Sequence, residues 1–306
     1  THQAAQWLIN QQATDGSFEA WSSPTIKPFT PLRKQPCIFQ TILIAEAIKD
    51  IPELDTVHKK ACDFVANERR SDGSWTYWLQ NAQQQQTEPY PPDLDDTACA
   101  TALLADQQTP QQMAQVAHLL TRAEQAPGGP YATWLCDWRQ RPEWHDIDPA
   151  VNANVAYMLK RLGVHLEPLK QYLSASGLSS SYYVGQAPLY YFYARAGIDS
   201  VRGSLLAHLK NVKTPSDLEV ALLLSAGCHF KIDKALLQPL HYQLVRSHGT
   251  HWSVEAFYVD PVYDAEPLYR FYNVQNGSHF YTASAAERDG VRTRWPHIYT
   301  YEGVAY

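Results

Sequence analysis

Apolar and polar residues alternate over residues 1–260 in a pattern that predicts two kinds of helix. The first kind has one apolar stripe and many charges, which is typical of a half-exposed helix. The sequence predicts six of these: His2–Gln12, Val57–Arg69, Gln111–Glu124, Glu167–Ala175, Val201–Leu209 and Lys231–Arg246. The second kind is rich in Ala, Leu and Tyr and poor in charge, which is typical of a helix buried on most sides. The sequence predicts five of these: Pro36–Ile48, Asp93–Asp106, Asp148–Leu162, Gly185–Ala196 and Asp217–Ala226.

A short turn sequence recurs between these helices. Asp15–Phe18 reads Asp-Gly-Ser-Phe, and 57 residues later Asp72–Trp75 reads Asp-Gly-Ser-Trp. After 56 more residues Gly128–Tyr131 continues the series, which Gly185 and Gly249 extend more weakly. Three tryptophans lie at one offset from the turns and are expected to join neighbouring units: Trp21, Trp78 and Trp134. A shared period of this length is typical of a repeat architecture, here a ring of helix pairs.

The predicted fold is all-α: an α/α toroid over residues 1–260, with about six outer and five inner helices. The pattern changes after His248–Trp252, where a sixth inner helix would stand. Leu268–Asn273 and His279–Thr282 alternate like strands on either side of Asn276-Gly277, a strong hairpin signal. Residues 261–306 are therefore predicted to form a small α+β tail, which is too short for a large core and is expected to pack on the toroid.

Charge and composition exclude several kinds of function. The chain has 306 residues, a net charge of −6 and no run of more than two Lys or Arg, so nucleic acid is not expected as a partner. No apolar run approaches the ~18 residues of a membrane-spanning helix, so a cytoplasmic or a secreted location is expected. The five cysteines, an odd number, predict no disulfide framework, and no paired-ligand motif predicts a metal site.

Three carboxylates gather at the start of one inner helix. Asp93, Asp95 and Asp96 follow Pro91-Pro92 directly and precede the small-apolar run Ala98–Leu104. Pro and Asp are both favoured at a helix N-terminus, so the simplest interpretation is an acidic helix cap. Carboxylates this close cannot all ionise at low cost, so the cluster also has the chemistry of a proton donor. A Ca²⁺ or Mg²⁺ site is a further interpretation.

The turns and the acids together resemble a known family. The Asp72–Trp75 turn resembles the QW repeats of class II terpene cyclases, and Asp93-Leu94-Asp95-Asp96-Thr97-Ala98 resembles their acidic motif. The resemblance covers roughly residues 1–255, one toroid of the kind shared by squalene-hopene cyclase and prenyltransferases. It implies that Asp95 protonates a C=C or epoxide of a linear isoprenoid to start carbocation cyclisation, with Asp93 and Asp96 in support. It implies no cofactor, except Mg²⁺ if the substrate is a diphosphate.

In the family that the chain resembles, a polar residue on the next inner helix, often His, assists the acid. One period of 56 residues after Asp96 lies Asn152, so the resemblance assigns this role to Asn152, Asn154 or His145. Asn154 is also expected to contact substrate.

Aromatic side chains are a second requirement, because ring faces stabilise a carbocation in an apolar cavity. Tyr190 and Tyr191 lie on a predicted inner helix, and Tyr182 and Tyr183 on the loop before it. These four are predicted to line the substrate cavity. The alternative is that they pack in the core, as aromatic residues at helical spacing commonly do.

The tail gives a second functional hypothesis. Leu268–Tyr306 resembles a repeat of bacterial lectin-like modules, and its aromatic residues either stack on a glycan or pack on the toroid: Tyr269, Phe271, Tyr272, Phe280 and Tyr281. The alternative to a cyclase is thus a non-catalytic toroid that binds a small ligand or a glycan. An isoprenoid substrate would also be compatible with peripheral contact with a membrane.

Overall fold

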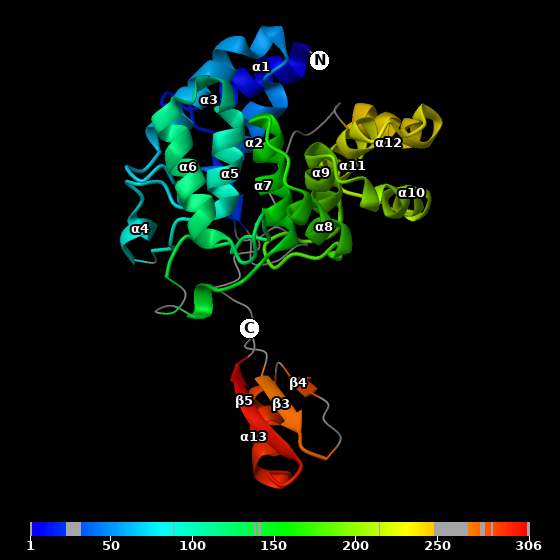
Figure 1. The fold of residues 1–306 in the computed structure, drawn as a ribbon. Coiled ribbons are helices and arrows are strands. Elements are labelled where there is room, and N and C mark those ends of the chain that lie inside the picture. The colour runs from blue at the N-terminus through cyan, green and yellow to red at the C-terminus, as the bar shows by residue number, and fades with distance from the viewer. Residues whose placement is uncertain are drawn as a thin grey trace. The chain divides into compact units, whose positions relative to one another are not determined.

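The computed structural model describes residues 2–22, 32–87, 89–137, 139, 142–213, 215–247, 269–275, 279–282 and 284–304. These residues belong to two compact units, Thr1–Val259 and Asp260–Tyr306. The first unit is helical, and the second is a small sheet with one helix (Figure 1). Each is described by itself.

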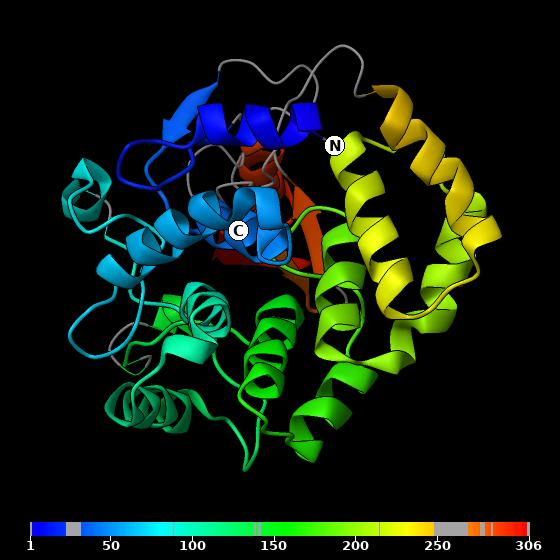
Figure 2. The same cartoon turned by 90° about the horizontal axis from the view of Figure 1, so that it is seen from above.

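Two sets of helices form the first unit. The outer set is α1 (His2–Gln11), α3 (Asp55–Asn67), α6 (Pro110–Ala123), α8 (Glu167–Ala175), α10 (Arg202–Asn211) and α12 (Lys234–Ser247). The inner set is α2 (Phe39–Ile48), α5 (Leu94–Leu103), α7 (Pro149–Arg161), α9 (Ala187–Ala196) and α11 (Asp217–His229). Figure 2 shows the inner set following one another around a ring, with the outer set outside it. Within the described residues, this confirms the predicted all-α toroid with six outer and five inner helices.

Short elements join these helices. The Pro-rich loop before α2 contains the antiparallel pair β1 (Ala20–Ser22) and β2 (Arg33–Gln35), and the Gln-rich loop before α5 contains α4 (Gln83–Thr87). The 3₁₀ turns of the described part of this unit are η1 (Pro52–Leu54), η2 (Ala105–Gln107), η3 (Pro142–Trp144) and η4 (Asp199–Val201). Neither loop contains an apolar period long enough to indicate a regular element from sequence.

Burial explains why the inner helices carry so few charges. Every residue of α5 is buried, and its alanines let α2 and α7 pack closely on either side. By contrast α6, an outer helix, buries only Val116, Leu119 and Ala123, and a Thr109–Gln112 capping box begins it. The inner helices therefore form the core, and any polar side chain on them needs a specific reason to be there.

Each of the first three turns is tied to the inner helix that follows it. The backbone N–H of the turn aromatic donates to a side-chain oxygen of that helix: Phe18 to Thr41 (2.9 Å), Trp75 to Thr97 (3.1 Å) and Tyr131 to Asn152 (2.9 Å). Gly16 and Gly73 in these turns have φ of +95° and +90°, and a Cβ on Gly16 would lie 2.2 Å from the Lys60 carbonyl oxygen. The repeat in the sequence is therefore a repeat of hydrogen bonds.

Turn tryptophans differ in their surroundings. Trp78 stacks on Tyr90 with ring centroids 5.6 Å apart, and Trp134 contacts Tyr90 at 5.9 Å, so Tyr90 joins two units. Trp21 is 44% exposed, and its expected role in joining units stays a prediction. Trp21 lies within β1, where it pairs with Lys34 of β2.

The second unit has its own small core. Strand β3 (Tyr269–Asn273) pairs antiparallel with both β4 (His279–Thr282) and β5 (Tyr299–Val304), and α13 (Ala285–Arg294) contacts the sheet. Tyr269 and Phe271 are buried against Val291 of α13. These two rings are therefore not available to stack on a glycan.

Several predicted features fall on residues outside the described ranges. They are the His248–Trp252 segment, the Asn276-Gly277 turn, and the side chains of Phe280 and Tyr281. Packing of the tail on the toroid stays a prediction.

Candidate functional site

The start of α5 is held between two turns. Asp93 is extended (φ −129°, ψ 162°), and its N–H donates to the Trp75 carbonyl (3.3 Å). The N–H of Leu94, the first residue of α5, donates to the Thr133 carbonyl (2.7 Å). The turns of two successive units therefore fix where α5 begins and where its first acidic side chains point.

Asp93 is the N-cap of α5. Its Oδ1 accepts the backbone N–H of Asp96 at 2.8 Å, so the simplest interpretation of the motif, a helix cap, holds for this residue. Burial, together with the charge of Asp95, raises the pKa of Asp93 to about 7, although the cap bond acts in the opposite direction.

Asp95 has a partner on each carboxyl oxygen. The side chain of Asn154 on α7 donates from Nδ2 to Oδ1 at 2.6 Å, and the Tyr183 hydroxyl donates to Oδ2. Asp95 is only 4% exposed, and burial raises its pKa to about 6. The two hydrogen bonds and the positive charge of Arg195 lower the pKa, whereas the charge of Asp148 raises it.

Asp96 has no such support. It is 1% exposed, and within the described part of the chain neither carboxyl oxygen accepts a hydrogen bond. Burial and the charges of Asp93 and Asp95 raise the pKa of Asp96 well above its ordinary value. Asp96 is therefore the member of the cluster that keeps its proton, and the three acids have three different environments.

A buried cation lies behind Asn154. Arg195 of α9 donates from Nη2 to Asn154 Oδ1 at 2.6 Å and to Cys99 Sγ at 3.3 Å. Its guanidinium lies over three aromatic rings: Tyr157 (4.6 Å), Tyr191 (5.0 Å) and Phe192 (4.8 Å). The sequence prediction did not include Arg195. The signal was available, because Arg195 is the one charged residue in Ala187–Ala196.

The structure brings three of the predicted site residues together with Asp95 or with its neighbours. Asn154 and Tyr183 bind Asp95 directly, and Tyr191 packs under the Arg195 guanidinium. The ring of Tyr183 also contacts Phe39 (6.0 Å between centroids) and Phe192 (4.8 Å). Asp95 therefore stands beside a group of aromatic rings.

Other predicted residues make different contacts. Asn152 bonds through Oδ1 and Nδ2 to the backbone of Tyr131, and through Nδ2 to the Asp148 carbonyl (3.0 Å). The Tyr182 hydroxyl accepts the indole N–H of Trp134 (2.9 Å). Three further contacts lie outside the acid cluster: Tyr190 with Ser204 of α10 (2.8 Å), and His145 with Gln125 (3.1 Å) and the Pro142 carbonyl (3.2 Å).

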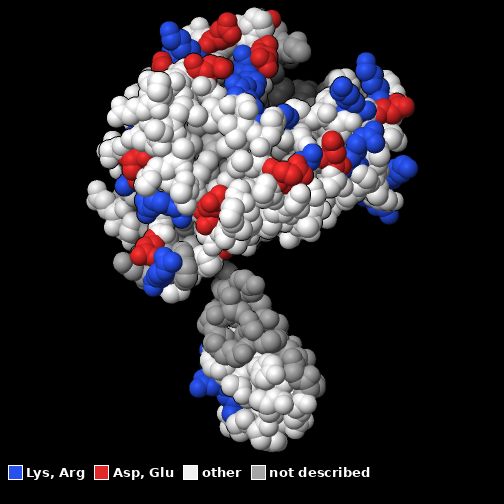
Figure 3. Space-filling model, viewed as in Figure 1, with Lys and Arg blue, Asp and Glu red and all other residues white. Residues whose placement is uncertain are grey.

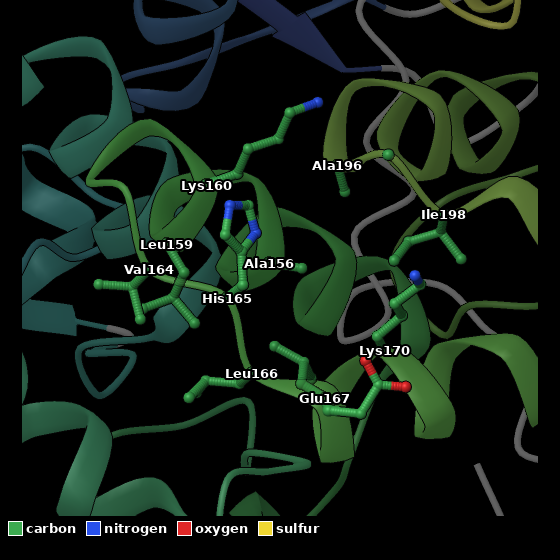
Figure 4. Close-up of a pocket in the computed structure, with 12 residues that line it drawn as sticks. Ala156, Leu159, Lys160, Val164, His165, Leu166, Glu167, Lys170, Ala196 and Ile198 are labelled. Carbon is green, nitrogen blue, oxygen red and sulfur yellow. The ribbon is translucent and has the colours of Figure 1, made fainter.

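A separate pocket of about 360 Å³ lies between α7, α8 and α9. Figure 4 shows its apolar side chains together with Lys160, His165, Glu167 and Lys170. It contains none of the three acids.

Among the described residues, no helix has the length and hydrophobicity needed to cross a membrane, and no three His, Cys, Asp or Glu side chains are arranged to hold a metal ion. On the face in Figure 3, acidic and basic side chains of the helical unit are interspersed.

Two parts of the chain match known family models. Residues 36–161, which include the acids and Asn154, match the family model of the sesquiterpene cyclase astC-like C-terminal domain. Residues 240–306 match a domain of unknown function, DUF5648. No curated protein matches the chain significantly. The resemblance of the tail to lectin-like modules therefore stays a prediction.

Solved structures of MstE, a type II terpene cyclase from Scytonema, are similar to this chain. A variant in complex with its substrate geranylgeranyl dihydroxybenzoate is 15% identical with a TM-score of 0.57, covering 80% of this chain and 77% of that one. A variant in complex with its product merosterolic acid A is 14% identical with a TM-score of 0.58, covering 81% and 77%. The helical unit has a terpene-cyclase-like fold. At this identity the likeness shows the fold, and the chemistry has to be argued from the site.

Proposed function

We propose that the protein is a class II-type terpene cyclase in which Asp95 protonates a C=C or epoxide of a linear isoprenoid. One observation carries the proposal: Asp95 is a buried carboxyl at the start of an inner helix, and Asn154 and Tyr183 donate to its two oxygens. An acidic cap needs only a bond to backbone N–H groups, and Asp93 already makes that bond. The shared fold and the matching family model support the same conclusion.

The proposed first step transfers one proton. The O–H bond of Asp95 breaks, the π electrons of the alkene form a C–H bond, and the positive charge remains on the other alkene carbon. The next double bond attacks that carbon, and the sequence ends when a carbon loses a proton or adds water. The Asp95 carboxylate that remains is stabilised by Asn154, by Tyr183 and by the positive end of the α5 dipole, the last worth ~0.3–1 kcal/mol.

The neighbouring acids have different roles in this proposal. Asp93 holds the first turn of α5 in place through its bond to the Asp96 N–H. Asp96 retains its proton, so it places no second negative charge beside Asp95. A neutral neighbour makes Asp95 a stronger acid than a charged one would, because the carboxylate formed after donation meets no additional repulsion.

Aromatic rings beside the acid suit the cation that follows. The Tyr183 ring contacts both Phe39 and Phe192 next to Asp95. Ring faces attract a cation, by about 2 kcal/mol or more where water is excluded. Tyr183 thus combines a hydroxyl that donates to the acid with a ring that packs beside it. Tyr182 and Tyr190, with their hydroxyls bound to Trp134 and Ser204, are assigned to the scaffold.

Product formation by wild type and Asp95→Asn tests the proposal. Each is incubated with farnesyl diphosphate, geranylgeranyl diphosphate and squalene, with and without Mg²⁺, and products are identified by gas chromatography and mass spectrometry. Wild type is expected to cyclise at least one substrate, and Asp95→Asn to lose at least about 100-fold in rate, because general acids contribute about 10²–10⁴-fold.

Asp106→Asn is the matched control, since Asp106 is exposed and pairs only with Arg161 among the described residues. It should retain the wild-type rate. Unchanged substrate in every wild-type reaction would contradict the cyclase proposal and favour a non-catalytic toroid. A rate for Asp95→Asn equal to that of wild type would contradict the role of Asp95 alone.

A further inference from the structure

Asp95, Asn154 and Arg195 form a continuous chain of hydrogen bonds across three inner helices. Arg195 Nη2 donates to Asn154 Oδ1 (2.6 Å), and Asn154 Nδ2 donates to Asp95 Oδ1 (2.6 Å). Arg195 is 3% exposed. A buried guanidinium is costly unless it is paired, and arginine stays charged at any ordinary pH.

The order of donors along this chain fixes the orientation of the amide. A guanidinium only donates, so the side of Asn154 that faces Arg195 must be its oxygen. The NH₂ group of Asn154 must then face Asp95. With the amide reversed, its oxygen would face the carboxyl oxygen of Asp95, and its NH₂ would face a group that cannot accept.

The surroundings of Arg195 do not provide a carboxylate on the guanidinium itself. Its contacts are Asn154, the Cys99 sulfur and three ring faces, and within the described residues Nε has no partner. Glu46, whose charge also acts on Arg195, accepts its hydrogen bonds from other groups: the Tyr157 hydroxyl and Lys49 Nζ (2.6 Å). Arginine–carboxylate pairs are frequently direct and bidentate, whereas here the neutral Asn154 stands between Arg195 and Asp95.

Several ionisable groups surround Asp95, and Arg195 is the cation among those named here. On its own helix lie Asp93, Asp96 and Cys99, and Asp148 caps α7. Tyr183 and Asn154 contribute neutral hydrogen bonds. Arg195 contributes positive charge at the side of the acid where Asn154 binds.

We propose that Arg195 is a positioning residue for the acid: it turns the Asn154 NH₂ toward Asp95, and its buried charge stabilises the carboxylate left after proton donation. This inference rests on the proposed function for its catalytic meaning, but its structural content can be tested without turnover. The ring faces that Arg195 covers on Tyr157, Tyr191 and Phe192 are occupied by a cation, so those faces do not serve the carbocation.

A titration of Asp95 tests the structural content. Protein labelled with ¹³Cγ-aspartate is titrated by NMR, and the Asp95 signal is assigned by its loss in Asp95→Asn. In Arg195→Met the pKa of Asp95 should rise by about one pH unit, because an opposite charge is removed from a buried site. Arg195→Lys keeps the charge and should restore most of the difference. Arg161→Met, which removes a cation that pairs with the exposed Asp106 at the C-terminal end of α7, should leave the titration unchanged.

The pH profile of kcat tests the catalytic content, with whichever of the three isoprenoids wild type converts. In Arg195→Met the limb of the profile that falls at high pH should shift to higher pH by about one unit. The plateau rate should fall about 10-fold, since a weaker acid transfers its proton more slowly. A lower rate with an unmoved limb would mean a purely structural role and would overturn the proposal.

Two outcomes separate this inference from the proposed function. If wild type converts no isoprenoid but the Asp95 titration shifts in Arg195→Met, the cyclase proposal fails and the positioning role stands. If the titration of Arg195→Met equals that of wild type, the positioning role fails whatever the activity. Should Arg195→Met not fold, Arg195→Gln replaces it, because Gln retains an NH₂ donor for Asn154 without the charge.

Discussion

Three carboxyl groups on one turn of α5 differ because each has a different set of partners. Asp93 accepts a backbone N–H, Asp95 accepts two side-chain donors, and Asp96 accepts none among the described residues. Burial raises the pKa of all three, and hydrogen bonds to the charged form oppose it only for Asp93 and Asp95. The division into cap, proton donor and protonated neighbour therefore follows from local contacts.

At the level of Asp95, the rate of cyclisation should depend on pH. The proton donor must carry its proton, and burial raises the pKa of Asp95 to about 6. The rate should therefore be highest below pH 6 and fall about tenfold for each pH unit above it. Steady-state kcat between pH 5 and pH 8 measures this, with unfolding monitored at each pH. A rate that rises from pH 6 to pH 8 would contradict Asp95 as the acid.

Replacement of Asp96 by Asn should stabilise the protein at alkaline pH. The pKa of Asp96 is raised in the folded state, so the unfolded chain releases this proton at lower pH than the folded one. The free energy of unfolding therefore falls as the pH rises above the unfolded pKa of about 4, and an uncharged amide at this position has no such dependence. Asp96→Asn should therefore be more stable than wild type at pH 8, with a smaller gain at pH 5.

Urea unfolding followed by circular dichroism at both pH values measures this difference. Asp106→Asn, with the exposed carboxyl, is expected to unfold like wild type at pH 5 and pH 8. If Asp96→Asn were no more stable than wild type at pH 8, the raised pKa of Asp96 in the folded state would be contradicted.

At the level of the elements, α5 contains two buried threonines one turn apart whose hydroxyl groups differ in hydrogen bonding. Thr97 accepts the Trp75 backbone N–H at 3.1 Å, whereas the Thr101 hydroxyl has no partner among the described residues. Thr97→Val leaves a buried N–H without an acceptor and should cost about 1–3 kcal/mol. Thr101→Val removes an unpaired hydroxyl and should be neutral or slightly stabilising. Thermal or urea unfolding of the two variants provides the comparison, and an equal loss in both would contradict the tie between turn and helix.

The same hydrogen bonds explain a limit of the sequence prediction. A shift of 56 residues from Asp96 pointed to Asn152, but in the structure Asn152 holds the Tyr131 N–H as Thr97 holds that of Trp75, a shift of 55. The segment between the tied residues is one residue shorter in the later unit, so Asn152 corresponds to Thr97 and not to Asp96. Asn154, the other candidate, is the residue that faces Asp95.

Across the whole molecule, the sequence predicted the elements that follow from local pattern. It did not predict the side-chain contacts between helices far apart in the sequence. The helix pairs, the acids at the start of α5 and the strand signals of the tail all follow from local pattern. The contacts of Arg195 with α5 and α7, and of Tyr157 with Glu46 of α2, join elements far apart in the sequence. No period specifies which long side chain crosses the interior, so these contacts required the structure.

The ties between turns and inner helices have a consequence for how such a chain can change. The tied residues lie 23, 22 and 21 positions apart in the three units, so the intervening loops already differ in length while the same hydrogen bond forms. Insertions among the exposed residues of these loops would not move either tied residue. These loops are therefore where homologues would be expected to acquire lids or new specificity, and where an engineer could graft a segment while the acid keeps its place.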